Sequence, residues 1–551
     1  SGCRVKRRGE AGTRASTPYC EGYLLITEHR RIEMQTHYDC IIIGAGHNGL
    51  VTAAYLAKAG KKVLVLERRA SVGGAAVTES FADAPAFKFS ALAENARLLP
   101  QIARDLNVNV EYIHSDVEIF APQPNGDALT LWRDMKRSAQ DIARFSKKDA
   151  ECYPPFVAQV NALSSVLSAL MTVIPPNLPN PSRADLFELA KLANPTRKLG
   201  TKNLHDLMRV LPMSMSDWLD EWFESDALRG ILAARAVTGI TWGPRAAGTA
   251  YTFLYSYAGG PAAQVQGGIG ALTQRLADAA KTFGAEIRAY ADVTNIITKD
   301  DAAVGVALKT GEEIFAPAIL SNADPRTTFL KLLDPQILDA YFLAEVQTIK
   351  YRGSCARAHF ALDALPEFSA LRAGDVNLLR GHIQIAPSLD YVERAYDDCK
   401  YGDISRAPYL DVTIPTLNDS SLAPQGKHVL SVYMQYAPYH LKKGTYAEQR
   451  ERLGNVVLDT LAPYAPNLKS IIRAKQIITP LDLEETYGLA EGNPNHGEMT
   501  LDQFLHNRPV AGYAQYRAPV RGLYLCGAGT HPGGGVTGAN GWNAARVVLK
   551  G

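Results

Sequence analysis

The chain has 551 residues, more than one hydrophobic core usually supports, so we expect at least two lobes. Hydrophobic residues make up 46% of it and charged residues 21%, and the formal net charge of +2 gives no reason to expect nucleic acid as a partner. No run of 18 apolar residues occurs, so we expect no transmembrane segment, whereas peripheral contact with a membrane stays open.

The seven cysteines are an odd number spread along the chain, which is typical of free thiols in a reducing compartment. No two of them form a CxxC pair, so the sequence lacks both a redox dithiol and the ligand spacing of a zinc ribbon. We therefore expect no disulfide framework and no metal site.

Residues 1–36 precede the first predicted strand. Their basic residues are mixed with glutamates, unlike the acid-poor composition of transit peptides, and they contain no signal-peptide core. We predict a disordered or extraneous tail, with an organelle-targeting role as the alternative.

A strand, a glycine turn, a helix and a second strand follow between residues 38 and 66, with the sequence GAGHNG at residues 44–49. This order matches the dinucleotide-binding fingerprint GxGxxG in its structural context. Gly44 would permit the tight turn, Gly46 would let the backbone approach a pyrophosphate, and Gly49 would let the helix pack closely on the strand.

A carboxylate and a pair of glycines come next. Glu67 ends the second strand at the distance expected of a residue that accepts hydrogen bonds from the adenosine ribose. Gly73 and Gly74 would lie beneath an extended dinucleotide. For Arg68 and Arg69, a solvated turn is as good an interpretation as a role at the site.

Residues 121–260 and 331–480 lie outside the cofactor motifs and would form a second lobe from two insertions. A helix is predicted around residues 218–235. The aromatic residues that follow it would line an apolar tunnel or belong to an ordinary core: Trp242, Tyr251, Phe253, Tyr255 and Tyr257.

The GGIG sequence at residues 267–270 is similar to a second fingerprint, but we reject that interpretation because no apolar strand leads into it. Residues 292–324 alternate apolar and polar side chains around turns at residues 300–301 and 310–311. They predict strands that return to the dinucleotide-binding lobe.

Near the end of the chain, a strand at residues 522–526 runs into GAGTHPGGGVTG at residues 527–538, and a helix begins near Ala539. Such glycine density indicates a backbone that turns sharply or approaches a ligand, with a plain surface loop as the alternative. His531 is the only titratable side chain of this segment, and a structural hydrogen bond explains it at least as well as a place in the site.

No HExxH, GxSxG or clustered Cys/His spacing occurs, so zinc hydrolysis and serine acyl transfer lack support. The two glycine-rich segments, with ERRASVGGAAVTE, QVQGGIGALTQRL and ITPLDLEETYGLAEGNPNHGEMTLDQ, resemble the phytoene desaturase and carotenoid isomerase branch of FAD enzymes. The resemblance covers nearly everything after Met34.

This resemblance implies an α/β fold of the flavin amine oxidase or desaturase type, with a Rossmann-like FAD-binding lobe, discontinuous in sequence, and an α+β substrate lobe. The FAD-binding domain would comprise residues 37–120, 261–330 and 481–551, and the substrate domain residues 121–260 and 331–480. The helix after the second glycine-rich segment would point its N-terminus at the flavin pyrimidine ring.

FAD is the expected cofactor, and residues at the matching motif positions are carried over as its contacts. They are Gly44, Gly46, His47, Asn48, Gly49, Glu67, Arg68, Gly73, Gly74, Ala75, Val293, Gly527, Gly529, Gly535 and Val536.

The resemblance predicts an FAD-dependent dehydrogenase, desaturase or redox-neutral isomerase that acts on a hydrophobic, polyene-like substrate by hydride transfer to flavin N5. A flavin amine oxidase is one alternative. A non-catalytic regulatory or lipid-escort protein of the same fold, as the Rab GDP-dissociation inhibitors are, is the other. No catalytic residue is assigned. Because the chain has no second Rossmann unit, oxygen or a quinone is the expected electron acceptor. The cytoplasm is the expected location, and the mitochondrial matrix is the alternative.

Overall fold

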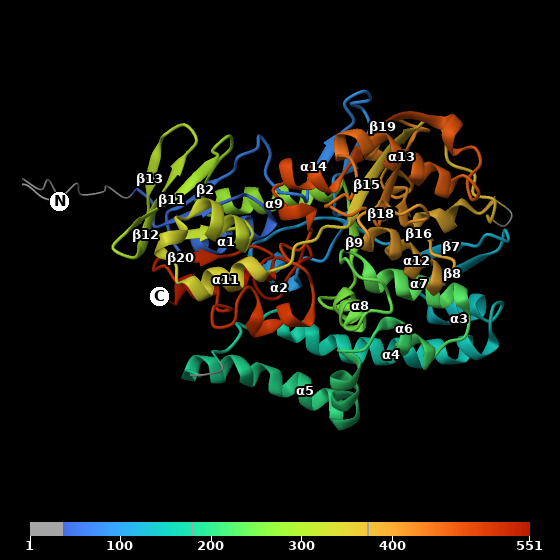
Figure 1. Ribbon diagram of the computed structural model, residues 1–551, viewed down its shortest axis with the longest axis horizontal. Helices are drawn as coiled ribbons and strands as arrows, with labels where there is room; N and C mark the ends of the chain where they lie inside the picture. Colours follow the sequence, from blue (N-terminus) through green and yellow to red (C-terminus); the bar gives the residue numbers. More distant parts are fainter. Residues whose placement is uncertain (1–36, 178–180, 372–373, 551) are drawn as a thin grey trace, which may run out of the picture. The chain divides into compact units, whose positions relative to one another are not determined.

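The computed structural model describes residues 37–177, 181–371 and 374–550, so the predicted tail at residues 1–36 lies outside them. Two large sheets organise the described chain (Figure 1). A parallel sheet carries the first glycine turn, and a mixed sheet carries most of the strands from the later insertion.

The parallel sheet has five strands, and all but the edge strand at residues 286–288 are buried along most of their length, as expected where helices connect parallel strands. Cys40 pairs with Val63 on one side and with Ala318 on the other. In sheet order the strands are β10 (Glu286–Arg288), β2 (Val63–Leu66), β1 (Cys40–Ile43), β14 (Ala318–Ser321) and β20 (Leu523–Leu525).

Successive residues of β1 face opposite layers, because side chains alternate along a strand. Ile42 belongs to the apolar cluster beneath the helices, whereas Ile41 packs on the other side of the sheet. The helices are α1 (His47–Lys58), α9 (Ile269–Thr282) and α15 (Ala539–Leu549). The opposite layer is an antiparallel sheet of β11 (Val293–Lys299), β12 (Ala302–Leu308) and β13 (Glu313–Phe315), with turns at the predicted places.

The seven-stranded sheet joins two distant stretches of sequence. Parallel pairing of His382 with Ile119 connects them. In sheet order the strands are β19 (Ile472–Ile478), β15 (Cys355–Leu362), β18 (His428–Gln435), β17 (Tyr409–Thr413), β16 (His382–Ile385), β7 (Val117–Pro122) and β8 (Ala128–Trp132). The domain boundary predicted after residue 120 falls inside β7, and the domain division itself stays a prediction.

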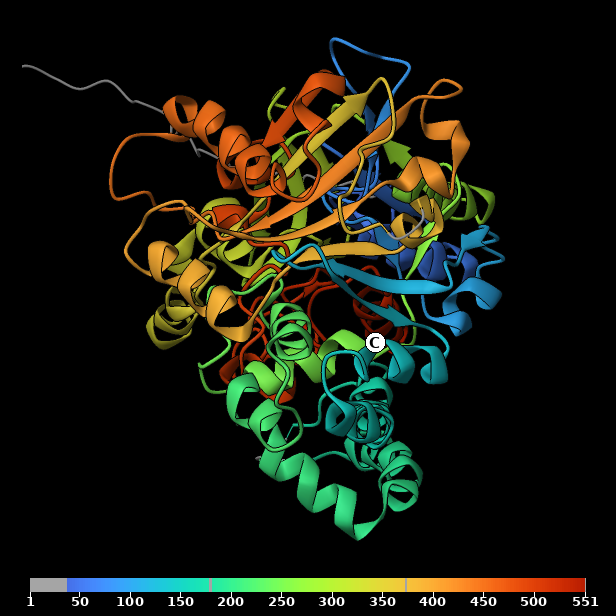
Figure 2. The same ribbon diagram turned by 90° about the vertical axis from the view of Figure 1, so that its right-hand side faces the viewer.

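Helices gather on one side of this sheet, as the teal and green ribbons of Figure 2 show. They are α3 (Met135–Ile142), α4 (Lys147–Leu170), α5 (Arg183–Val210), α6 (Met215–Asp220), α7 (Asp226–Val237) and α8 (Thr249–Tyr257). The orange helix α12 (Leu389–Lys400) packs against α7. The single helix predicted around residues 218–235 is two helices, α6 and α7. The chain breaks between them because the Asp149 carboxylate accepts hydrogen bonds from the backbone N–H groups of Glu224, at 3.0 Å, and Ser225, at 2.8 Å.

A strand does precede the GGIG sequence, so the expectation that none leads into it was wrong. This strand, β9 (Ala263–Val265), lies in a small antiparallel sheet between β5 (Asn95–Ala96) and β6 (Tyr112–Ile113). Because β9 is not part of the parallel sheet, the segment still lacks the parallel strand that a dinucleotide fingerprint requires.

Shorter elements complete the described chain. They include β3 (Thr78–Ser80), β4 (Lys88–Ser90), α2 (Pro100–Asp105), α11 (Ala340–Thr348), α13 (Tyr446–Leu461) and α14 (Pro480–Glu485). Across the described residues, no helix combines the length and the apolar character needed to cross a membrane.

Candidate functional site

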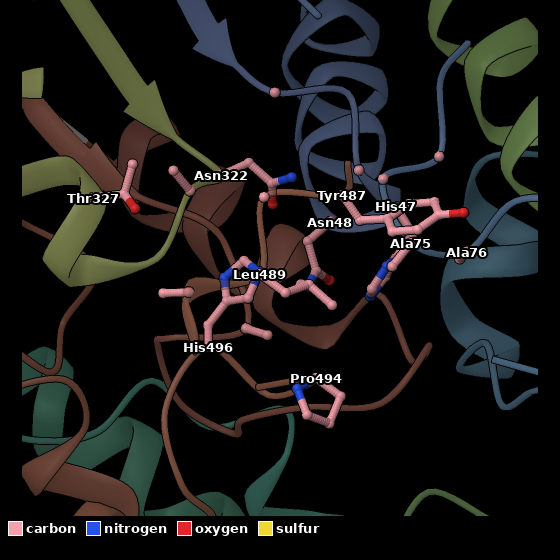
Figure 3. A pocket seen from close by; sticks show the side chains of 18 of the residues that line it. His47, Asn48, Ala75, Ala76, Asn322, Thr327, Tyr487, Leu489, Pro494 and His496 are labelled. Atoms are coloured by element: carbon pink, nitrogen blue, oxygen red, sulfur yellow. The ribbon is translucent and has the colours of Figure 1, made fainter. Parts of the chain in front are cut away.

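A cavity of about 770 Å³ lies at the carboxyl ends of the parallel strands (Figure 3). Most of its lining comes from short segments far apart in the sequence, within residues 43–48, 66–76, 291–293, 322–332, 484–496 and 528–536, and Leu92, Ala93, Thr238, Gly239 and Tyr433 complete it. All of the predicted cofactor contacts line it except Gly49, Gly527 and Gly529. The structure therefore brings both glycine-rich segments to one place, where α/β sheets bind their ligands.

The first glycine turn has the geometry that a dinucleotide needs. Gly44 has a φ angle of +92°, which L side chains rarely adopt. Gly46 is the N-cap of α1, so the unpaired N–H groups of the first helical turn face the ligand position. A Cβ atom at Gly49 would lie 2.3 Å from the carbonyl oxygen of Gly44, so close packing explains this glycine without contact to the cavity.

Glu67 is buried, and its carboxylate braces the turn as well as facing the cavity. One carboxylate oxygen accepts a hydrogen bond from the backbone N–H of Ala45 at 2.8 Å, and the other accepts one from Arg69 at 3.0 Å. Each oxygen can accept a further bond. The predicted ribose contact is thus compatible with a second role, holding the glycine turn in place.

Arg68 and Arg69 both line the cavity, but Arg68 is exposed and Arg69 is only partly buried, so the solvated turn and the role at the site both stay open. The Arg68 guanidinium donates to the carbonyl oxygens of Glu485 and Thr486, both at 3.0 Å. Arg69 forms an ion pair with Glu79 at 2.6 Å. Both arginines tie the first glycine region to the chain around it.

Polar atoms in the cavity wall lack protein partners. They are His47 Nε2, Asn48 Oδ1 and His496 Nδ1, and Figure 3 shows the three side chains around one space. Burial, reinforced by the nearby His496, lowers the pKa of His47 to about 4, so its imidazole is neutral at pH 7. Unpaired buried polar atoms are costly unless a ligand satisfies them, so this wall fits a polar cofactor such as FAD.

In the second glycine-rich segment, Gly535 and Val536 line the cavity, whereas Gly527 and Gly529 pack against protein. A Cβ atom at Gly527 would lie 2.6 Å from the Asn322 carbonyl oxygen, and one at Gly529 would lie 2.4 Å from Cδ of Pro325. Close packing thus accounts for both glycines, and their contact with FAD stays a prediction. The helix that follows begins at Ala539, as predicted.

His531 forms the structural hydrogen bond considered above. Its Nε2 lies 2.8 Å from the carbonyl oxygen of Leu170, and burial lowers its pKa to about 4. It lines neither cavity described here.

A second cavity, of about 790 Å³, meets the first at Thr238, Asn495, Gly535 and Val536, which line both. Some of the aromatic residues between 242 and 257 line a cavity, as the tunnel interpretation expected, and others are ordinary core residues. Tyr255 and Tyr257 line this second cavity, whereas Tyr251 and Phe253 are core residues with exposed fractions of 1% and 0%. Trp242 lines neither cavity, and its indole N–H donates to a carboxylate oxygen of Glu498 at 3.4 Å.

Four arginines line the second cavity: Arg97, Arg133, Arg235 and Arg380. Two carboxylates, Glu118 and Asp411, and one histidine, His382, are the other ionisable acidic and imidazole groups of its lining. Both carboxylates have a partner among them. Glu118 accepts from Arg235 at 2.8 Å, and Asp411 lies 2.8 Å from His382 Nδ1. Although burial lowers the pKa of His382, Asp411 outweighs it and the net effect is a raised pKa.

Several lining residues of the first cavity were not predicted individually. Asn322 follows β14, and Tyr487, Pro494, Asn495 and His496 come from the loops after α14. The family resemblance included the segment from residue 478 to 503, but no motif within it marked which side chains would face a ligand.

The model of the family "Flavin containing amine oxidoreductase" matches residues 49–549. "Pyridine nucleotide-disulfide oxidoreductase domain-containing protein 2" of Rattus norvegicus is 35% identical over 98% of this chain and 98% of its own length. A limonene dehydrogenase polypeptide of Castellaniella defragrans is 30% identical over 93% of this chain and 94% of its own.

A crystal structure of an oxidoreductase from Methanosarcina mazei has the same fold, with a TM-score of 0.60 and 17% identity, covering 93% of this chain and 100% of that one. The predicted fold class and the predicted flavin family are thereby confirmed. The chain belongs to the flavin containing amine oxidoreductase family and is an FAD-dependent oxidoreductase.

Proposed function

We propose that this oxidoreductase acts on carbon atoms of a hydrophobic substrate, as a dehydrogenase, desaturase or isomerase. The observation that carries the proposal is the meeting of the two cavities at Gly535 and Val536, because a molecule in the second cavity would lie next to the cofactor in the first. Apolar and aromatic side chains supply much of the second cavity's wall, among them Ile119, Trp132, Met135, Val157, Met171 and Tyr255.

Charge favours a neutral or anionic substrate over a protonated amine. Within the described lining, the arginines outnumber the carboxylates, and Glu118 and Asp411 already have cationic partners. An ammonium group would enter a cationic cavity with no unpaired carboxylate to bind it, which is costly. The name of the limonene dehydrogenase relative also fits a hydrocarbon substrate.

FAD, when bound, supplies a hydride acceptor at N5. In a desaturation, the flavin would accept a hydride from one carbon of the substrate, a proton would pass from the neighbouring carbon to water, and a C=C bond would form. Oxygen or a quinone would then take the electron pair from the reduced cofactor. Residues of the chain would bind and orient the two molecules: the N-terminus of α1 would hold the pyrophosphate, Glu67 would accept hydrogen bonds from the ribose, and the second cavity would hold the substrate.

The test is the absorbance of the purified protein under anaerobic conditions, during addition of polyene hydrocarbons and of amines with matched carbon chains. We expect a polyene either to bleach the flavin band at about 450 nm, in a desaturation, or to change its own double-bond geometry without bleaching, in an isomerisation. The band should persist with the amines. Bleaching by amines alone would contradict the proposal and identify an amine oxidase.

A further inference from the structure

Arg97 is held at the place where the two cavities meet. Its backbone N–H donates to the carbonyl oxygen of Val536 at 3.1 Å, and the N–H of Leu99 donates to the carbonyl oxygen of Thr537 at the same distance. Val536 lines both cavities, and Arg97 and Thr537 line the second. The backbone that carries the Arg97 guanidinium is therefore fixed to the glycine-rich segment of the cofactor site.

The Arg97 side chain is partly buried and has few partners. Its Nη1 donates to the carbonyl oxygen of Ala258 at 2.8 Å, and no carboxylate of the described residues lies within 4.0 Å of it. A guanidinium offers five N–H donors, so most of its capacity is unused. Burial and the nearby Arg235 cation lower the pKa of Arg97 to about 10, which leaves it charged at neutral pH.

The other arginines of the second cavity are satisfied. Arg235 donates to the Glu118 carboxylate at 2.8 Å and to Ser256 Oγ at 3.1 Å, and it lies 4.0 Å from the centre of the Tyr257 ring. Arg133 and Arg380 are exposed, so water hydrates them. Arg97 is thus the lining arginine that combines partial burial with the absence of an anionic partner among the described residues.

The Arg97 guanidinium, with unused donors beside apolar walls, favours a ligand that combines an anion with an apolar body. A partly buried charge is costly unless an anion pairs with it, and a planar carboxylate can accept two parallel hydrogen bonds from one guanidinium. A phosphate usually gathers several cations, whereas Arg235 is already neutralised by Glu118.

We propose that Arg97 binds the anionic head group of the substrate, and that the substrate is an apolar acid, a hydrocarbon chain that carries a carboxylate. This inference rests on the proposed function, because it names the substrate class of the same cavity. It adds a binding residue to a site where sequence motifs assigned none.

The test measures binding to the FAD-loaded protein for fatty acids from octanoate to oleate, each compared with its alcohol and its primary amine. We expect at least one acid to bind about tenfold or more tightly than its alcohol and amine. Arg97→Met should remove this preference by weakening the acid about tenfold, with little change for the alcohol. Arg97→Lys, which keeps the charge without the bidentate geometry, should lose only part of it.

Arg133→Met is the matched control, because it removes another arginine of the same cavity and should keep the preference for the acid. Each variant is compared at equal FAD content, and Arg97→Lys carries the test if Arg97→Met does not fold. The inference is overturned if no acid of the series binds more tightly than its alcohol, or if Arg97→Met leaves the preference intact. Because binding is measured without turnover, failure of the proposed function shows separately, as an enzyme that neither oxidises nor isomerises any carbon substrate of the series.

Discussion

The two cavities of this chain are similar in volume, about 770 and 790 Å³, but they are built differently. Seven glycines line the first, and its unpaired polar atoms belong to neutral groups such as His47 and Asn48. The second is formed by residues of both insertions together with residues from 95–119, 261–264 and 495–537, and it contains arginines and paired carboxylates. The first is thus suited to one fixed cofactor, whereas side-chain chemistry decides what the second admits.

Filling each cavity in turn tests this difference most strongly. Ala75 lines only the first cavity, Ala262 lines only the second, and both are partly exposed. Ala75→Trp should weaken FAD binding by about 100-fold or more, since an indole occupies ligand space. Ala262→Trp should retain FAD with an unchanged absorbance spectrum. Loss of FAD from both variants would show that the cavities do not act separately.

Removing the Glu67 carboxylate tests whether the first cavity depends on a braced turn. Glu67→Ala removes the acceptor for the Ala45 and Arg69 N–H groups and the predicted ribose contact, so FAD affinity should fall by roughly 30-fold. Glu79→Ala is the control, because Glu79 pairs with Arg69 without lining the cavity. Fluorescence titration with FAD measures both, and equal losses would contradict the special role of Glu67.

A pair of glycine substitutions separates backbone strain from cofactor binding. Gly44 and Gly60 have φ angles of +92° and +83°, and a Cβ atom at either position meets no contact shorter than 3.6 Å. Alanine should therefore cost roughly 1–2 kcal/mol of stability at each. Only Gly44→Ala should also weaken FAD binding, by about tenfold. Similar FAD affinities for the two variants would mean that the turn need not fit the pyrophosphate.

As the pH falls, protonation of His47 should lower the stability of the fold, whereas protonation of His382 should raise it. His47, with its pKa lowered to about 4, binds a proton less readily than in the unfolded chain, so it reduces stability as pH falls from about 6.5 to 4. His382, with its pKa raised, contributes stability that is present below about pH 6.5 and lost as pH rises through its folded value. His47→Gln should make the decrease of Tm with falling pH smaller, and His382→Gln should make it larger. Changes of the same sign would contradict these assignments.

The glycine turn was predictable because its geometry follows from a few adjacent residues. Gly44 and Gly46 do what the fingerprint requires, and the strands at residues 40–43 and 63–66 lie where the apolar pattern placed them. The lining of the second cavity was not predictable, because it depends on long-range pairing. His382 reaches it through the contact of β16 with β7, and no local pattern specifies that register.

The sequence did not distinguish glycines that face the cofactor site from glycines that pack against protein. Gly49, Gly527 and Gly529 are predicted cofactor contacts that do not line the cavity. A Cβ atom at these positions would lie within 3 Å of Gly44, Asn322 and Pro325, respectively. Glycine is needed equally where a ligand approaches and where two segments of backbone touch, so the residue type alone does not distinguish the two causes.

The most direct test of the account is the anaerobic reduction of the flavin by one carbon substrate in the wild type and in Ala262→Trp, with dithionite as a reductant that needs no binding site. We expect the substrate to bleach the wild-type flavin and not that of the variant, while dithionite bleaches both. Equal bleaching by the substrate in the two proteins would show that the second cavity does not hold the substrate.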